Sequence, residues 1–394
     1  MTENPTLVQR LTDLGRRALG MRRRLPSAPP PPAERKKYKG YSQWRLVWRR
    51  FLRNRAGVAG GVVILFIAFC VFFAEFLSPH HVNTRYNEYT HMPPQRVHIF
   101  SADGIHLPFV YAIRGYVDPE TGLRKYVEDR STRHTIRFFT RGDTYSFYGI
   151  FESDIRFIGA GQGNPFFLLG TDRFGRDLLS RILVGGRVSF TVGLLAVFLS
   201  LTLGTMMGMI SGYYGGVIDN FVQRTIEVIY SFPSIPILMA LSALLPPHWP
   251  GYLTFMGIVT VLALVGWGGL AREIRGKTLA IRDSDFVLAA RVAGAKDGRI
   301  IFRHVLPAMS SHVIVITTLA IPSFILSEST LSFLGLGIKP PMTSWGLLLS
   351  DAMNIYVLAL YPWLLFPGLC ILITVLAFNF LGDGIRDATA PFGH

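Results

Sequence analysis

Few side chains in this sequence have the types and the spacing that catalysis requires. The phosphate-binding pattern G-x-x-x-x-G-K-[ST] and the zinc-binding pattern H-E-x-x-H do not occur. The segment 381–384 partly resembles an aspartyl protease motif, but Phe380 stands where that motif has glycine, and no second aspartate lies in an apolar run. Cys70 and Cys370 lie in apolar runs, where cysteine is typically a small buried hydrophobe. We therefore expect no catalytic residue, no metal site and no cofactor in this chain.

One carboxylate lies within an apolar run. Glu328 is costly to place in a membrane, and such residues usually face a bundle interior or a cavity. Two interpretations stay open: Glu328 lines a translocation path, or it bonds to Ser327, Ser329 or a partner subunit. Pro340, Pro341 and Trp345 follow shortly after and suggest a short re-entrant or interfacial gate on the outer side.

A second cluster combines charges of both signs. Asp172, Arg176, Asp177 and Arg181 suit an amphipathic helix at the outer surface, with Asp177 and Arg181 spaced to interact as i and i+4. We favour a structural clamp over direct contact with a substrate.

Long apolar helices must position these residues. Half of the residues are hydrophobic, only 16% are charged, and the mean hydropathy is +0.34; a span needs about 20 apolar residues. Pro233, Pro236 and Pro322 predict bends that neighbouring helices can absorb. The expected fold class is an all-α membrane protein with six transmembrane helices, at residues 56–78, 188–211, 225–245, 252–271, 313–336 and 359–381. The last five form a core over residues 188–381.

Basic residues are concentrated before the first span. Residues 1–55 hold fifteen lysines and arginines against three acids, which is +12 of the net +15. Because this charge directly precedes an apolar run, it fits the positive-inside rule better than binding of nucleic acid. Loop 272–312 holds eight more basic residues. We expect both termini in the cytoplasm, with a basic, proline-rich tail over residues 1–55 and a short tail over residues 382–394.

A long hydrophilic insert, residues 79–187, separates the first two spans. Alternating stretches such as 96–100 and 135–139 are divided by turn signals at 102–104, 118–122 and 141–143. This pattern predicts a β-rich extracytoplasmic domain, periplasmic in a bacterium.

The polar loop 283–307 predicts two short helices joined by a glycine. Asp283, Ser284 and Asp285 are candidate N-caps of a helix that runs to about residue 293. Gly294 can take a positive φ and end that helix. A second helix should begin at 296–297 and be closed by Pro307.

The spacing A-A-x-x-x-G-(x)11-L-P in this loop resembles the ATPase-coupling loop of ABC importer permeases. The matching residues are Ala289, Ala290, Gly294, Leu306 and Pro307, whereas Leu288 replaces the usual glutamate.

Three further segments resemble the "C" type of dipeptide and oligopeptide permeases. They are 169–181, 328–346 and 381–387, so that the resemblance covers residues 169–387. In the first of them the matching residues include Gly170, Thr171, Asp172, Gly175, Arg176, Asp177 and Arg181.

The resemblance implies a multi-pass subunit of a bacterial inner membrane. It would form a path with a homologous second permease, couple to separate cytoplasmic ATPase subunits that bind ATP and Mg²⁺, and receive cargo from an outer substrate-binding protein. Peptides are the expected cargo, and nickel, opines and oligosaccharides are known cargos of similar permeases. The alternatives are a stand-alone channel or secondary transporter, which would need an intramembrane relay, and a membrane-embedded enzyme.

Overall fold

The computed structural model describes residues 43–101, 104–161 and 165–389. Residues 1–42 of the basic, proline-rich tail predicted over residues 1–55 lie outside these ranges, as do the last five residues of the C-terminal tail. The chain divides into two compact units, residues 1–46 and 47–394, and the architecture below belongs to the second unit.

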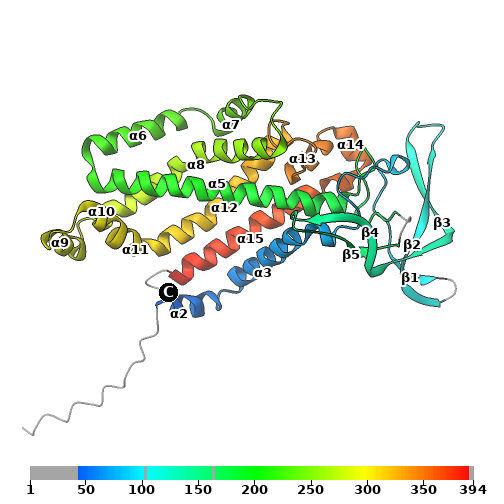
Figure 1. The fold of residues 1–394 in the computed structure, drawn as a ribbon, viewed down its shortest axis with the longest axis horizontal. Coiled ribbons are helices and arrows are strands. Elements are labelled where there is room, and N and C mark those ends of the chain that lie inside the picture. The colour runs from blue at the N-terminus through cyan, green and yellow to red at the C-terminus, as the bar shows by residue number, and fades with distance from the viewer. Residues whose placement is uncertain (1–42, 102–103, 162–164, 390–394) are drawn as a thin grey trace, which may run out of the picture. The chain divides into compact units, whose positions relative to one another are not determined.

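Helices account for most of the described residues, and five strands follow the first long helix (Figure 1). The N-terminal elements are α2 (Gln43–Phe51), α3 (Arg55–Phe72), α4 (Ala74–Leu77), η1 (Asn87–Tyr89), β1 (His98–Ser101), β2 (Gly104–Val117), β3 (Arg124–Thr135), β4 (Arg137–Phe147) and β5 (Phe151–Gly159). The later elements are α5 (Leu178–Tyr214), α6 (Gly216–Tyr230), α7 (Ser234–Ala243), α8 (Gly251–Ile281), α9 (Asp285–Val292), α10 (Asp297–Ile300), η2 (Ile301–Val305), α11 (Leu306–Ala308), α12 (Ser310–Phe333), α13 (Trp345–Leu349), η3 (Ser350–Ala352), α14 (Ile355–Leu360), η4 (Pro362–Leu365) and α15 (Phe366–Thr389).

Within the described ranges, five helices are long and apolar enough to cross a membrane, and a sixth span results if α6 and α7 count as one. These two helices meet at a bend of 86°. The residues at the bend are Ser231, Phe232 and Pro233, and the proline supplies no amide hydrogen to continue α6. The expected class of a helical membrane protein with a β-rich insert between its first two spans is confirmed.

Four spans extend well beyond their predicted limits. Helix α8 continues to Ile281 instead of ending at residue 271, so the predicted loop 272–312 begins inside it, and α6 begins at Gly216 instead of residue 225. Helix α5 begins at Leu178 instead of residue 188, because the Asp177 side chain caps it by accepting a hydrogen bond from the Ser180 amide at 2.8 Å. Helix α15 continues through Thr389, so residues 382–389 are helical instead of forming a separate tail. At this end, the Asn54 amide at the start of α3 donates to Asp387 at 2.9 Å.

Glycines allow the long helices to pack backbone against backbone. Gly204, Gly208 and Gly212 repeat every four residues along α5 and therefore share one face, which lies against α8. A Cβ atom at Gly208 would lie 2.5 Å from the Ala271 carbonyl oxygen. Gly60 of α3 faces α15 in the same way, with the Ala377 carbonyl oxygen 2.5 Å from the position of its missing Cβ. Small residues of this kind permit close helix contact where lipid offers little hydrophobic driving force.

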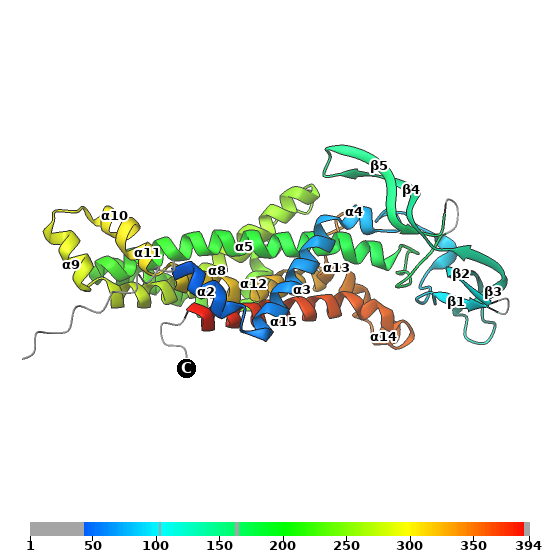
Figure 2. The same ribbon diagram turned by 90° about the horizontal axis from the view of Figure 1, so that it is seen from below.

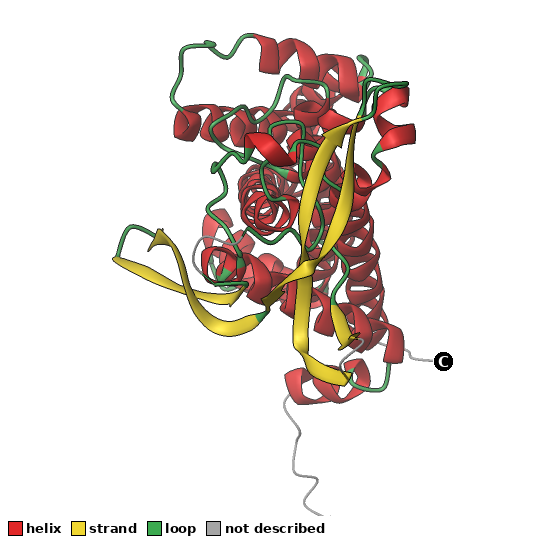
Figure 3. Ribbon diagram, turned by 90° about the vertical axis from the view of Figure 1, so that its right-hand side faces the viewer, coloured by secondary structure: helices red, strands yellow, loops and turns green. Residues whose placement is uncertain are grey.

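The insert consists of two small antiparallel sheets. The first has the order β1-β2-β3, and the second pairs β4 with β5. Seen along the helices, the two long hairpins run in different directions (Figure 3). The strands and the segment α9–α11 lie at opposite ends of the long helices (Figures 1 and 2). The helical bundle therefore separates the hydrophilic insert from the polar loop 283–307.

Candidate functional site

A cavity lies between the long helices. Its volume is about 770 Å³, and its walls come from α6, α7, α8 and α12 around the 86° bend. The lining is mostly apolar, with hydroxyl-bearing residues at Tyr230, Ser234, Ser323 and Ser327. Glu273 is the one charged side chain among the described lining residues. An apolar cavity with a few polar groups is the usual form of a small-molecule site, and the sequence patterns pointed neither to this cavity nor to Glu273.

Glu328 does not line this cavity. It is fully buried, and its carboxylate accepts hydrogen bonds from Ser189 at 2.8 Å, from Ser332 at 2.7 Å and from Ser329 at 3.3 Å. Ser327, the other predicted partner, donates instead to the Ser323 carbonyl oxygen. A buried carboxylate needs such donors, because its desolvation is otherwise costly. This environment favours the bonding interpretation of Glu328 over the path interpretation.

One of the predicted gate residues, Trp345, is attached to the same cluster. The Trp345 backbone amide donates to the Ser189 hydroxyl at 3.1 Å, and the Trp345 indole donates to the Ile182 carbonyl oxygen at 2.9 Å. Trp345 is buried at the start of α13, whereas Pro340 and Pro341 are exposed in the preceding loop. The structure thus ties α5, α12 and α13 together through hydrogen bonds at Ser189.

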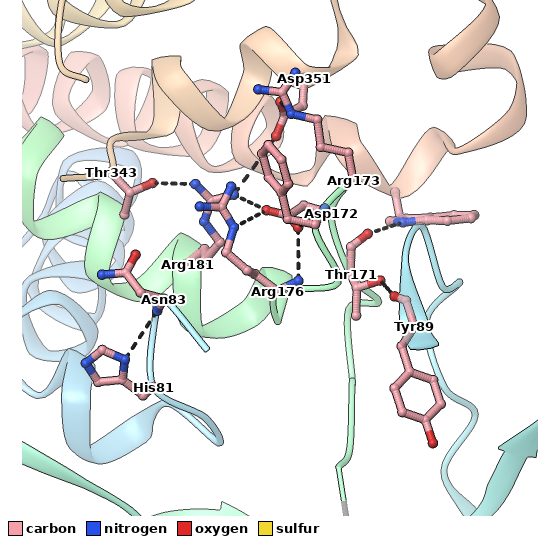
Figure 4. A network of polar contacts seen from close by, with 12 residues as sticks. His81, Asn83, Tyr89, Thr171, Asp172, Arg173, Arg176, Arg181, Thr343 and Asp351 are labelled. Atoms are coloured by element: carbon pink, nitrogen blue, oxygen red, sulfur yellow. Dashed lines mark hydrogen bonds and ion pairs between the residues drawn. The ribbon is translucent and has the colours of Figure 1, made fainter. Parts of the chain in front are cut away.

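The charged family motif forms a buried ion cluster before and within the first turns of α5 (Figure 4). One Asp172 oxygen accepts from the amides of Phe174 at 2.8 Å and Arg176 at 2.9 Å. The other accepts from the Arg176 guanidinium at 2.7 Å and from the Arg181 guanidinium. Arg181 also donates to the Thr343 hydroxyl at 3.4 Å.

This geometry corrects two expectations about the motif. Residues 172–177 form a turn instead of an amphipathic surface helix, and Asp172, Arg176, Asp177 and Arg181 are all buried. Arg181 pairs with Asp172 instead of Asp177, because Asp177 is the N-cap of α5. The predicted i and i+4 pair of Asp177 and Arg181 was wrong because the helix begins one residue after Asp177. Buried charges that join distant segments fit a clamp, and no exposed carboxylate of this cluster is available for a substrate.

The remaining motif residues shape the turn. Gly170 and Gly175 have φ values of +78° and +70°, and a Cβ at Gly175 would lie 2.0 Å from the Tyr86 carbonyl oxygen. The Thr171 hydroxyl accepts from the Met92 amide at 2.8 Å and donates to the Tyr89 carbonyl oxygen. Nearby, burial raises the pKa of Asp351, while its ion pair with Arg173 at 3.2 Å opposes that shift.

The loop motif forms a short helix pair, as its sequence predicts. Helix α9 begins after Ser284 and ends at Val292, and Gly294 follows with a φ of +79°. Pro307 does not close the second helix. It lies in α11 after a π-helical turn, in which the Leu306 amide bonds to the Ile301 carbonyl oxygen. The wider turn accommodates the proline, and Met309 after α11 leaves helical backbone angles, with φ −100° and ψ 4°.

One face of this segment, residues 282–309, is anchored to the bundle. Val287, Ile300 and Val305 are fully buried in a cluster with residues of α5 and α8. Tyr213 of α5 donates to the Asp297 carboxylate at 2.8 Å, and Arg282 donates to the Gly212 carbonyl oxygen at 3.1 Å.

The opposite face is open. Leu288, Val292 and Phe302 are 41%, 90% and 60% exposed, respectively. Ala289, Gly294 and Pro307 are exposed as well, whereas Ala290 and Leu306 are half-buried. The segment therefore presents a small apolar surface on a base that is fixed to two long helices.

Two family models match the chain. One, described as the binding-protein-dependent transport system inner membrane component, matches residues 204–392. The other, described as the N-terminal TM domain of oligopeptide transport permease C, matches residues 42–94.

Curated proteins match over longer stretches. The oligopeptide transport system permease protein OppC of Haemophilus influenzae is 44% identical over 231 residues, which cover 58% of this chain and 71% of that protein. OppC of Escherichia coli K12 is 32% identical over 365 residues, covering 91% and 94% of the two chains. The glutathione transport system permease protein GsiD of Pectobacterium atrosepticum is 31% identical over 348 residues, covering 88% and 91%.

Proposed function

The chain belongs to the binding-protein-dependent transport system inner membrane components, in the oligopeptide permease C branch, and from this membership we propose how its surfaces serve transport. It is a multi-pass inner-membrane permease subunit of an ABC importer, and its family is a non-catalytic component that works with a separate ATPase. The docking surfaces, the orientation and the cargo proposed below go beyond this membership.

We propose that the exposed face of residues 282–309 docks on a cytoplasmic ATPase subunit. The observation that carries this proposal is the contrast between the two faces of the segment: Val287 and Ile300 are fully buried in the bundle, whereas Leu288 and Val292 are exposed. Exposed apolar side chains on a rigid base are typical of protein interaction sites. Leu288 stands in the position of the family glutamate, so this docking would rest on shape and apolar contact instead of a salt bridge.

The orientation follows from the same proposal. If residues 282–309 face the cytoplasm, the start of α3 and the end of α15 lie on that side as well, and the β-strand insert lies at the periplasmic end (Figure 1). Eight basic residues in loop 272–312 support this orientation. A substrate-binding protein would deliver cargo at the insert end.

The cavity of about 770 Å³ is our candidate for this subunit's share of the translocation path. A homologous second permease would complete its wall. We propose peptides as cargo, because the relatives are named for oligopeptide, dipeptide and glutathione transport. The mostly apolar lining, with one acidic group at Glu273, suits peptides of varied side chains that carry a positive amino group.

Two glycines of the docking segment offer a matched test. Gly294 and Gly298 are both exposed, and neither has an atom within 4 Å of the position of an added Cβ, but only Gly294 has a positive φ, +79°. Gly294→Val should therefore strain the joint between α9 and α10 by about 1–3 kcal/mol. In proteoliposomes with the complete transporter, we expect it to abolish uptake while the ATPase subunits still hydrolyse ATP.

Gly298→Val is the control and should retain uptake, because it adds the same side chain without backbone strain. Wild-type uptake in Gly294→Val would contradict the coupling role. Equal loss of uptake in both variants would show that the added side chain, and not the joint, causes the defect.

A further inference from the structure

The tip of the β4–β5 hairpin is uncharged and apolar. Residues 144–151 read Thr-Tyr-Ser-Phe-Tyr-Gly-Ile-Phe, without a charged side chain. The Ile150 amide donates to the Phe147 carbonyl oxygen at 2.9 Å and closes a tight turn, in which Tyr148 and Gly149 have positive φ values. Ile150 is 79% exposed and Phe151 is 55% exposed. A soluble hairpin normally places polar residues at such a turn, so this tip needs another explanation.

The tip is attached to the outer end of the first span. Tyr148 donates a hydrogen bond to the Phe72 carbonyl oxygen at 3.3 Å, and the two rings lie 5.5 Å apart. Phe147 packs against Phe72 and Phe73, with ring centroids 5.8 Å and 6.1 Å apart. Phe72 is the last residue of α3. The apolar surface of the span therefore continues without a break onto the hairpin.

Three helices place the same boundary of the membrane at this level. Helix α3 ends at Phe72, and α8 begins at Gly251, directly before Tyr252. On α5, Arg187 precedes the apolar run, forms an ion pair with Glu75, and lies with its guanidinium carbon 4.4 Å from the Tyr148 ring centroid. Tyrosine, arginine and aromatic rings at one level are typical of the membrane–water interface.

A side cavity lies behind the tip. Its volume is about 480 Å³, and its lining includes Phe72, Tyr148, Arg187, Tyr252, Phe255 and Met256. Arg187 is the one charged lining residue that the described ranges supply to it. A mostly apolar space whose described lining includes one cation, Arg187, suits the upper part of a lipid acyl chain.

We propose that the β4–β5 tip inserts into the outer leaflet, and that a phospholipid acyl chain fills the cavity between Tyr148, α3, α5 and α8. Beside α4, the hairpin extends sideways from the helices, so its tip can reach lipid (Figure 2). Charged residues flank the tip directly, at Asp143 and Glu152, and continue along the strands at Arg141 and Asp154. The contact with lipid is thus confined to the tip. It anchors the second sheet of the insert to the bilayer and leaves the first sheet in water.

A fluorescent reporter can distinguish lipid from water and from protein. Ile150→Cys and, as the matched control, Leu107→Cys would each be made with Cys70→Ala and Cys370→Ala and labelled with an environment-sensitive dye. Leu107 is 73% exposed on β2, in the sheet that we place in water. The complete transporter would be reconstituted in vesicles of phosphatidylethanolamine and phosphatidylglycerol that contain a lipid with a nitroxide near its headgroup.

At residue 150 we expect blue-shifted emission, strong quenching by the nitroxide lipid and little quenching by aqueous iodide. At residue 107 we expect the reverse. Iodide quenching at residue 150 as strong as at residue 107 would overturn the proposal, because the tip would then lie in water. Protection of residue 150 from both quenchers would also overturn it, because a partner protein would then cover the tip.

Discussion

Asp172→Ala should be among the most destabilising single changes outside the apolar core. The substitution removes the acceptor of two backbone amides and two guanidinium groups. It leaves the Arg181 side chain, which is 4% exposed, with the more distant Asp351 carboxylate at 4.0 Å in place of the close pair with Asp172. Removing one partner of a buried ion pair typically costs about 3–5 kcal/mol, because the remaining charge stays desolvated. We expect a loss of this size in the free energy of unfolding.

An exposed ion pair in the same insert serves as the control. Arg141 and Asp154 approach to 3.7 Å, but their side chains are 77% and 43% exposed. Asp154→Ala should cost less than about 1 kcal/mol, because water screens such a pair. The double variant Asp172→Ala with Arg181→Met should recover part of the loss, since it removes the uncompensated charge as well.

The folded fraction of the purified protein in mixed micelles, followed along an SDS titration, measures these differences. Our account of the ion cluster fails if Asp172→Ala is no more destabilising than Asp154→Ala. It also fails if the double variant is less stable than Asp172→Ala alone, because Arg181 would then be stabilising without its partner.

Two further outcomes are expected. Glu328→Gln should keep uptake near wild type, because the amide oxygen still accepts from the Ser189 or Ser332 hydroxyl. Glu328→Leu should lower the thermal midpoint, because it leaves these hydroxyls unpaired at a cost of about 1–3 kcal/mol each. Loss of transport in the glutamine variant with unchanged stability would favour a role in the path. The Lys125 ammonium, with the Glu120 amide, lowers the pKa of Asp118 to about 2. Since this folded-state pKa is depressed, the contribution of Asp118 is present above its unfolded pKa and is lost as the pH falls through about 2; a carboxyl titration by NMR that gives an ordinary aspartate pKa would contradict the pairing.

Local signals made the docking segment predictable. The N-cap candidates at 283–285 and the glycine at 294 are close in sequence, and the helix between them begins after Ser284 and ends at Val292. The spans were predictable for a similar reason, because a run of apolar residues long enough to cross a membrane needs no distant partner. The limits of α5, α6, α8 and α15 were missed, since these helices continue through residues where hydropathy is low.

Long-range contacts were not predictable in this way. Glu328 and Ser189 are separated by 139 positions, and Arg181 and Thr343 by 162. No spacing rule links such residues, so the sequence left the role of Glu328 open and paired Arg181 with the wrong aspartate. The main cavity has walls from four helices, and its position depends on the bend at Pro233, whose angle a proline alone does not specify.

The glycine-lined contact between α5 and α8 has a mechanical consequence. With the backbones already touching at Gly208, the two helices cannot approach further, and separating them would open an empty gap in a dry interior. They should therefore move as one stiff beam. Tyr213 and Arg282 attach residues 282–309 to the end of this helix pair. A displacement of residues 282–309 should therefore move α5 and α8 together as a rigid body. Bending must then occur in another part of the bundle. The break at 231–233 between α6 and α7, on the wall of the cavity, is the expected hinge.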